Sequence, residues 1–198
     1  MHRSDRKRVE RGAIDLADLF TIRTGEPVYD NVRNEAARAA GEIIKVKGRN
    51  GSQACRYYAA PDNRCEIYTD RPLECRLLNC WDTTDIEAAY AVDRLTRQEL
   101  IGSVKGLWEL IADHEERCSY LKLARRLERM KVQRDKQMAE QIAESINFDT
   151  QLRLLLVDRH QMNPDLLDFL LGRPMEIIFT GFGYQIRREE GLVRFIPG

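Results

Sequence analysis

The sequence lacks the features that most readily assign a protein to a class: an excess of charge of one sign, a membrane-spanning segment and a signal peptide. Its 32 Lys and Arg residues are balanced by 32 Asp and Glu residues, so no global field attracts it to nucleic acid or to anionic lipid. No apolar run approaches the roughly 20 residues that cross a bilayer, and MHRSDRKRVERG at the start lacks the apolar stretch of a signal peptide. The sequence therefore predicts a cytoplasmic protein whose partners include neither nucleic acid nor a membrane.

Recognisable catalytic motifs are missing as well. The sequence has no glycine-rich phosphate loop, no dinucleotide fingerprint and no GxSxG nucleophile turn. Hydrolase chemistry is therefore not supported, and no catalytic residue is assigned.

The cysteines are few but concentrated. Four of the five fall in one 26-residue window with the spacing Cys55-x9-Cys65-x9-Cys75-x4-Cys80, and no histidine lies between them. Cytosolic thiols are kept reduced, and clustered ones are more often metal ligands or redox groups than disulfide partners. The window therefore predicts a metal site, with burial of small residues in a core as the alternative. Cys118 lies on the apolar stripe of a predicted helix, so we expect it to pack in the core.

Four thiolates define the chemistry that such a site accepts. Soft sulfur ligands suit tetrahedral zinc or a [4Fe-4S] cluster, in which each iron takes one cysteine, whereas calcium and magnesium prefer oxygen. The spacing matches neither the paired C-x2-C of a zinc ribbon nor the bacterial ferredoxin pattern. These residues alone do not decide between zinc and an iron-sulfur cluster.

Arginines accompany the cysteines. A site of four thiolates carries a net charge of about −2, and guanidinium groups beside it would offset that charge and lower the pKa of the thiols. We assign this supporting role to the arginines nearest the cysteines in sequence: Arg56, Arg64, Arg71 and Arg76. The alternative is that these side chains point in different directions and are solvated.

Part of the window resembles a known family. CEIYTDRPLECRLLNC is similar to the signature of the YkgJ-like cysteine-cluster family, the CxxCxxCC type of zinc- or iron-chelating domain, in which C-x-I-Y-x-x-R-P-x-x-C-R leads to a final cysteine. The matching positions are Cys65, Ile67, Tyr68, Arg71, Pro72, Cys75, Arg76 and Cys80. The resemblance spans about the first 80 to 100 residues. It implies a metal site and favours iron and sulfur over zinc.

The chain departs from this family in one respect. Family members begin with a CxxCxxCC segment, and no cysteine precedes Cys55 here. A half-site variant and a truncated gene product both explain the difference. Our expectation is truncation, because the chain enters directly into the region that follows the missing segment.

Local signals predict a mainly α protein with small β-hairpins, an α+β fold. We divide it into a cysteine-cluster metal-binding domain (1–95) and a helical C-terminal region that ends in short strands (96–198). In the first part we expect helices over LADLFTIRTG, EAARAAG and RPLECRLLN, and a hairpin of EIIKVKG with ACRYYA.

Capping boxes predict two helix starts, one at Thr84–Glu87 near the end of the first part and one at Thr96–Glu99, which opens a long helical region in the second part. TQLRLLLVDRH is a further apolar helix, and Asn163-Pro164 starts another that ends at Gly172. MEIIFTGFGYQIRREEGLVRFIPG then predicts short strands with turns at Gly181, Gly183 and Gly191.

These observations converge on a metal-binding protein that holds an iron-sulfur cluster, [4Fe-4S], or alternatively zinc, through the four cysteines. A redox or electron-transfer role with a protein redox partner follows if the cluster is iron-sulfur, and the enzymatic alternative is an iron-sulfur oxidoreductase. A structural zinc module and a metal-free helical interaction module also stay open as functional classes.

Overall fold

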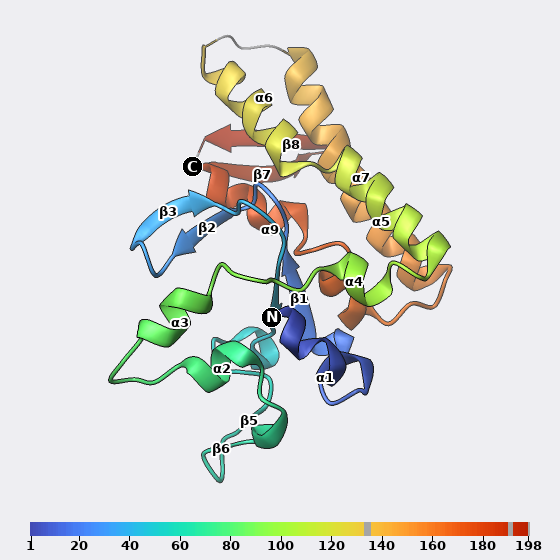
Figure 1. Cartoon of the computed structure of the whole chain (residues 1–198). Coiled ribbons are helices and arrows are strands. Elements are labelled where there is room, and N and C mark those ends of the chain that lie inside the picture. The colour runs from blue at the N-terminus through green and yellow to red at the C-terminus, as the bar shows by residue number, and fades with distance from the viewer. Residues whose placement is uncertain (133–135, 190–191, 198) are drawn as a thin grey trace.

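The computed structural model of the chain describes residues 1–132, 136–189 and 192–197 (Figure 1). It is mainly helical with small antiparallel sheets, which confirms the predicted fold class. The α-helices are α1 (Arg6–Glu10), α2 (Leu73–Leu77), α3 (Thr84–Ala89), α4 (Arg97–Ile101), α5 (Lys105–Arg117), α6 (Tyr120–Val132), α7 (Lys136–Asp158), α8 (Leu167–Leu170) and α9 (Met175–Phe179). Short 3-10 helices are η1 (Arg3–Asp5), η2 (Leu16–Asp18), η3 (Arg49–Gly51), η4 (Tyr68–Asp70), η5 (Pro164–Leu166) and η6 (Thr180–Phe182).

The strands pair two by two, and every pair is antiparallel. The pairs are β1 (Leu19–Ile22) with β4 (Ile43–Val46), β2 (Pro27–Asp30) with β3 (Glu35–Arg38), β5 (Tyr58–Ala59) with β6 (Arg64–Cys65), and β7 (Tyr184–Glu189) with β8 (Leu192–Pro197). In Figure 1, α6 and α7 lie at one end of the molecule, and β5, β6 and α2 lie at the other. The cysteine window is therefore remote from the long helices.

The helix predicted over LADLFTIRTG is wrong. Asp15 does cap a helical turn, since its carboxylate accepts from the Ala17 N–H at 2.8 Å, but that turn is η2 and lasts three residues. The chain is extended from Leu19 onward and pairs with β4. The physical reason is the β-branched partner strand, which lies more than twenty residues away and satisfies the backbone groups of β1.

The helix predicted over EAARAAG is also wrong, because Glu35–Arg38 form β3. The turn before it decides the outcome: the Asp30 carboxylate accepts from the backbone N–H groups of Val32 and Arg33 at 3.0 and 3.1 Å. Asn34 closes the turn in the left-handed region, with φ of 56°. This turn chemistry outweighs the helix propensity of alanine.

The hairpin predicted between EIIKVKG and ACRYYA forms over a short stretch. The Arg56 N–H donates to the Lys47 carbonyl at 2.9 Å, the Arg49 N–H donates to the Ala54 carbonyl at 2.7 Å, and Gly48 and Cys55 form an isolated bridge. The residues of β4 pair instead with β1. Cys55 is thus held at a bridge and not within a strand.

Several helix ends agree with the sequence. The capping box of Thr96 and Glu99 is present at the start of α4. The box predicted at Thr84 and Glu87 is wrong, because Thr83 occupies the N-cap of α3 and its side chain makes no capping hydrogen bond. Helix α2 spans Leu73–Leu77, so it ends between Cys75 and Cys80. From the sequence, Asp70 would be expected to cap this helix, since aspartate is a favoured N-cap residue, but the N-cap position is occupied by Pro72.

The C-terminal part mixes agreement and correction. Asn163 caps η5, its side chain accepting from the Asp165 N–H at 3.0 Å. MEIIF was expected as strand but forms α9, which follows Pro174; β7 and β8 follow it. TQLRLLLVDRH is the end of α7, and the predicted turn at Gly191 lies outside the described residues.

Two hydrophobic clusters form the core. The first draws on both sides of residue 95, and its buried members are Met1, Val9, Ile14, Leu19, Ile44, Tyr57, Leu95, Ile101, Ile111, Leu156, Leu167, Phe169, Leu170 and Leu171. The second lies among α6, α7 and α9, with buried members Cys118, Tyr120, Leu123, Leu127, Ile142, Ile146, Met175, Ile178 and Phe179.

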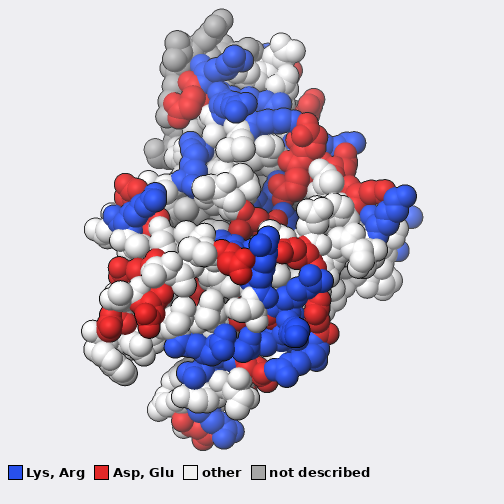
Figure 2. Space-filling model, in the orientation of Figure 1, with Lys and Arg blue, Asp and Glu red and all other residues white. Residues whose placement is uncertain are grey.

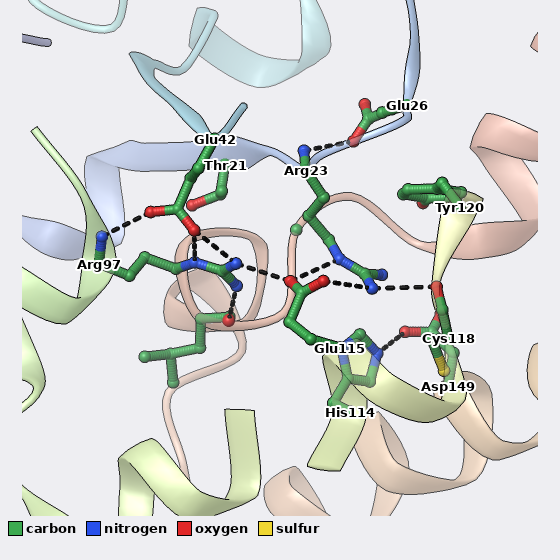
Figure 3. A network of polar contacts seen from close by, with 12 residues as sticks. Thr21, Arg23, Glu26, Glu42, Arg97, His114, Glu115, Cys118, Tyr120 and Asp149 are labelled. Atoms are coloured by element: carbon green, nitrogen blue, oxygen red, sulfur yellow. Dashed lines mark hydrogen bonds and ion pairs between the residues drawn. The ribbon is translucent and has the colours of Figure 1, made fainter. Parts of the chain in front are cut away.

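A buried ionic network lies beside these clusters (Figure 3). The guanidinium of Arg23, which is 1% exposed, donates to both carboxylate oxygens of Glu115 at 2.7 and 2.8 Å. Arg97 donates to the same carboxylate at 2.6 Å, to Glu42 at 2.7 Å and to the Leu170 carbonyl at 2.5 Å. The Glu115 carboxylate of α5 therefore connects this helix to the end of β1 and to α4. Arg97 also connects α4 to the end of α8, through the Leu170 carbonyl.

A second buried pair extends the network to α7 and α9. His114 Nε2 lies 2.8 Å from Asp149 Oδ1, and the other Asp149 oxygen accepts from the Met175 N–H at 3.0 Å. Burial lowers the pKa of His114. Burial alone would raise the pKa of Asp149, but the bond to His114 and the charge of Arg153 outweigh it and lower that pKa.

No helix within the described residues is sufficiently long and apolar to cross a lipid bilayer.

We predict that Glu115 makes stability depend on pH in the acid range. Burial alone would raise the pKa of Glu115, but Arg23 and Arg97 outweigh it and lower the pKa to about 2 from the ordinary 4.5. A depressed carboxyl pKa stabilises the fold above pH 4.5, and that stabilisation is lost as the pH falls toward 2. Glu115→Gln leaves the buried Arg23 guanidinium without its carboxylate, and Arg97 with that of Glu42 alone. It should lower the free energy of unfolding by about 3 kcal/mol at pH 7.

Urea unfolding between pH 7 and pH 3 measures this effect. The matched control is Glu116→Gln, because Glu116 is exposed and pairs with Lys122; it should stay within about 0.5 kcal/mol of wild type. Equal losses in the two variants would show that the network contributes nothing specific.

Candidate metal centre

The four predicted cysteine ligands come from short, separate elements at one end of the molecule (Figure 1). Cys55 pairs with Gly48 at the isolated bridge, and Cys65 belongs to β6, where it faces Tyr58 of β5. Cys75 lies in α2, and Cys80 lies in the turn that follows it. Cys55, Cys75 and Cys80 are exposed, whereas Cys65 is half-buried.

The helix that carries Cys75 is anchored by buried groups of the N-terminal segment. The Asp5 carboxylate, which is fully buried, accepts from the Leu73 N–H at 2.9 Å. The buried His2 ring lies 3.0 Å from Glu74 through its Nε2 atom, and Arg94 lies 3.6 Å from the same carboxylate. These contacts fix the first turn of α2 and so set the position of Cys75.

Tyr57 anchors the segments that carry Cys55 and Cys65. Its ring is buried in the first core cluster, its hydroxyl accepts from the Asp15 N–H at 3.3 Å, and its carbonyl accepts from the Glu66 N–H at 2.8 Å. Burial, and then the carboxylate of Asp18, raise the pKa of Tyr57. A neutral, immobile tyrosine thus lies between the two cysteine segments.

Three of the four thiols interact electrostatically. Although the residue as a whole is exposed, desolvation at the Cys75 thiol raises its pKa, and the charges of Cys55 and Cys65 raise it further. Glu74 and Asp5 act in the same direction. The structure therefore brings Cys55, Cys65 and Cys75 into one neighbourhood, with Cys80 on the adjoining turn.

The thiols do not form a complete coordination shell. All five cysteines are free. Across residues 1–132, 136–189 and 192–197, no group of three or more His, Cys, Asp or Glu side chains is arranged to hold a metal ion. The thiols are therefore gathered without being preorganised.

The arginines predicted to support the thiolates have various partners. Arg56 donates to Asp18 at 2.8 Å, and Arg64 lies 3.2 Å from Asp62. Arg71 donates to the Tyr68 carbonyl at 2.9 Å, and its guanidinium lies 3.7 Å from the centre of the Tyr68 ring. Arg76 is exposed on α2 beside Cys75.

A charged hollow adjoins the cysteine segments. It has a volume of about 450 Å³ and is lined by Asp18, Arg49, Arg56, Tyr57 and Glu66. Two of its residues follow Cys55 and Cys65 directly in the sequence. Arg49 lies 3.4 Å from Glu66 across it, so the charges that line this hollow are paired.

Sequence reasoning missed the anchors of the site. His2, Asp5 and Tyr57 fix the cysteine segments through contacts that span 42 to 72 positions of the chain. In the sequence, His2 and Asp5 lie in a highly charged N-terminal segment, and nothing there indicates a structural role for either residue. The one usable signal was the aromatic pair Tyr57 and Tyr58, which follows Cys55 closely in the sequence and is a further point of resemblance to the cysteine-cluster family.

Comparisons of the chain with protein-family models, with curated proteins and with solved structures found no match.

The predicted packing of Cys118 in the core is confirmed, and it leads to a test of the thiols. Cys118 is fully buried and its thiol donates to the Ser145 carbonyl at 3.4 Å. Burial raises its pKa to about 12, with a further contribution from Asp149. Since thiolates are the reactive form, we predict that native metal-free protein at pH 8 reacts with an aromatic disulfide reagent at the window cysteines, and that Cys118 reacts after unfolding in guanidinium.

Mass spectrometry of the labelled peptides assigns each thiol. Cys118→Ala should leave native labelling unchanged and remove the thiol that unfolding releases. Rapid native labelling of Cys118 would contradict the burial described above.

Proposed function

We propose that this chain is a metal-binding protein that holds an iron-sulfur cluster or zinc through Cys55, Cys65, Cys75 and Cys80. The observation that carries the proposal is the grouping of Cys55, Cys65 and Cys75 from three separate elements. Desolvation, and then the charges of Cys55 and Cys65, raise the pKa of the Cys75 thiol. A cation among them reverses this balance, because metal ligation stabilises thiolates. The Cys75 thiol is therefore protonated in the metal-free protein, and binding of a metal would release its proton.

The donor set fits a soft metal. Sulfur is the ligand that zinc and iron-sulfur clusters share, and four cysteines satisfy either. Cys80 completes the set from a turn that α2 does not constrain, since the helix ends at Leu77. Because the shell is not preorganised, binding is expected to be coupled to ordering of the 55–80 segment.

We favour iron and sulfur on the resemblance to the YkgJ-like cysteine-cluster family. The proposal includes a reducing cytoplasmic compartment, where free thiols persist, and an electron-transfer role. Exposed apolar side chains within the cysteine window and next to it in sequence are available to a protein redox partner. They are those of Tyr68, Leu78 and Trp81, and Trp81 is 85% exposed.

The test is anaerobic purification followed by iron, sulfide and zinc analysis and a visible spectrum. We expect about four iron and four sulfide per chain, with visible absorption that bleaches on reduction. Serine variants of Cys55, Cys65 or Cys75 should each lose most of the cluster. Cys118→Ala is the matched control and should keep it, because Cys118 is buried in the second core cluster.

The outcomes separate the competing functions. Stoichiometric zinc without sulfide contradicts the preference for iron. Absence of both metals, after reconstitution with iron and sulfide, contradicts the whole proposal. Fluorescence of Trp81, next to Cys80, should be quenched on loading of the wild type and unchanged in a Cys75→Ser variant given the same treatment.

A further inference from the structure

At the opposite end of the molecule from the cysteines, two hollows share a rim. One has a volume of about 630 Å³ and is lined by Arg38, Ala124, Arg125, Arg126, Glu128 and Arg129. The other has a volume of about 670 Å³ and lies between the β2–β3 hairpin, α6 and η6. Arg38 and Glu128 line both. We call them the arginine hollow and the aromatic groove.

Helix α6 presents its arginines outward because of its amphipathic pattern. Leu123 and Leu127 are buried in the second core cluster, so residues on the other side of the helix face solvent. Arg125 and Arg129 are one turn apart, and both are exposed. Arg38, at the end of β3, faces them across the hollow. Figure 2 shows Lys and Arg side chains gathered over the end of the molecule where α6 lies.

Among the described residues, the arginine hollow has an excess of positive charge. Four arginines line it and one carboxylate, that of Glu128, accompanies them. Within the described part of the chain, Arg125, Arg126 and Arg129 make no ion pair, in contrast to the doubly paired Arg97. Guanidinium groups gathered in this way bind phosphate through charge-assisted, bidentate hydrogen bonds.

The aromatic groove supplies a different kind of surface. Its rings belong to Tyr29, Phe182 and Tyr184, and Tyr29 is 57% exposed. Arg38 joins the two hollows: its guanidinium lies 4.9 Å from the centre of the Phe182 ring. A flat ring bound against Tyr29 would therefore have a cation at its edge and three more beyond it.

We propose that these two hollows bind a nucleoside di- or triphosphate, with the phosphates in the arginine hollow and the base against Tyr29 in the aromatic groove. Each volume falls within the range of about 300 to 1,000 Å³ typical of small-molecule sites. A phosphate chain alone leaves the groove unused, and an uncharged aromatic molecule leaves the arginines unneutralised. This site is independent of the proposed metal centre.

Calorimetric titration with ATP and with inorganic tripolyphosphate at low salt tests the proposal on the full chain. Arg129→Gln should weaken both ligands about tenfold, the loss of one charge-assisted hydrogen bond. Tyr29→Ala should weaken ATP about tenfold by removing one stacking surface, and should leave tripolyphosphate unchanged. Both side chains are exposed, so circular dichroism should show unaltered folds.

Arg159→Gln is the matched control, because Arg159 is an exposed arginine beyond the end of α7 and outside both hollows. It should leave both affinities unchanged. The proposal is overturned if ATP does not bind, if Arg129→Gln and Arg159→Gln have equal effects, or if Tyr29→Ala does not discriminate between the two ligands. Binding of a single-stranded RNA oligonucleotide without binding of ATP also overturns it.

Discussion

The carboxylate of Glu115 is the group on which the arrangement of the chain depends. It accepts from Arg23, at the end of β1, and from Arg97, at the start of α4, so two buried guanidinium groups that are far apart in the sequence meet at one half-buried anion. Two guanidinium groups could not approach each other in this setting without it. By fixing α5 it also places His114, which lies next to it in sequence, against Asp149 of α7. The docking of both core clusters thus rests on one ionised side chain.

The features that sequence predicted correctly are those whose cause lies within a few residues. The capping box of Thr96 and Glu99 is complete in four positions, and it is present. The failure at residues 16–25 concerns a partner that is distant, whereas that at EAARAAG has a local cause, the turn made by Asp30 and Asn34. Leu19 pairs with Val46. The helix prediction for residues 16–25 used only the local spacing of apolar residues, so it did not take account of a strand that begins at Ile43. The buried network was invisible for the same reason, since Arg23 has the spacing of a helical face.

The candidate metal centre shows the same division. Sequence spacing identified the thiols, and the structure brings three of them into one neighbourhood. What the spacing could not predict is how they are held. His2 and Asp5 position α2 through Glu74 and the Leu73 backbone. The partners of the flanking arginines were equally hidden, because Arg56 reaches a carboxylate 38 positions away.

The small sheet of β5 and β6 has a consequence for how readily the thiols could rearrange. Each of its strands has two residues, so few backbone hydrogen bonds connect it to the rest of the protein. Local opening of such a segment requires far less free energy than global unfolding. Such opening would separate Cys65 from the first core cluster, against which it packs, and move it relative to Cys75, while Tyr57 and Asp5 remain buried. A ligand could then enter this region after local opening alone, without global unfolding of the protein.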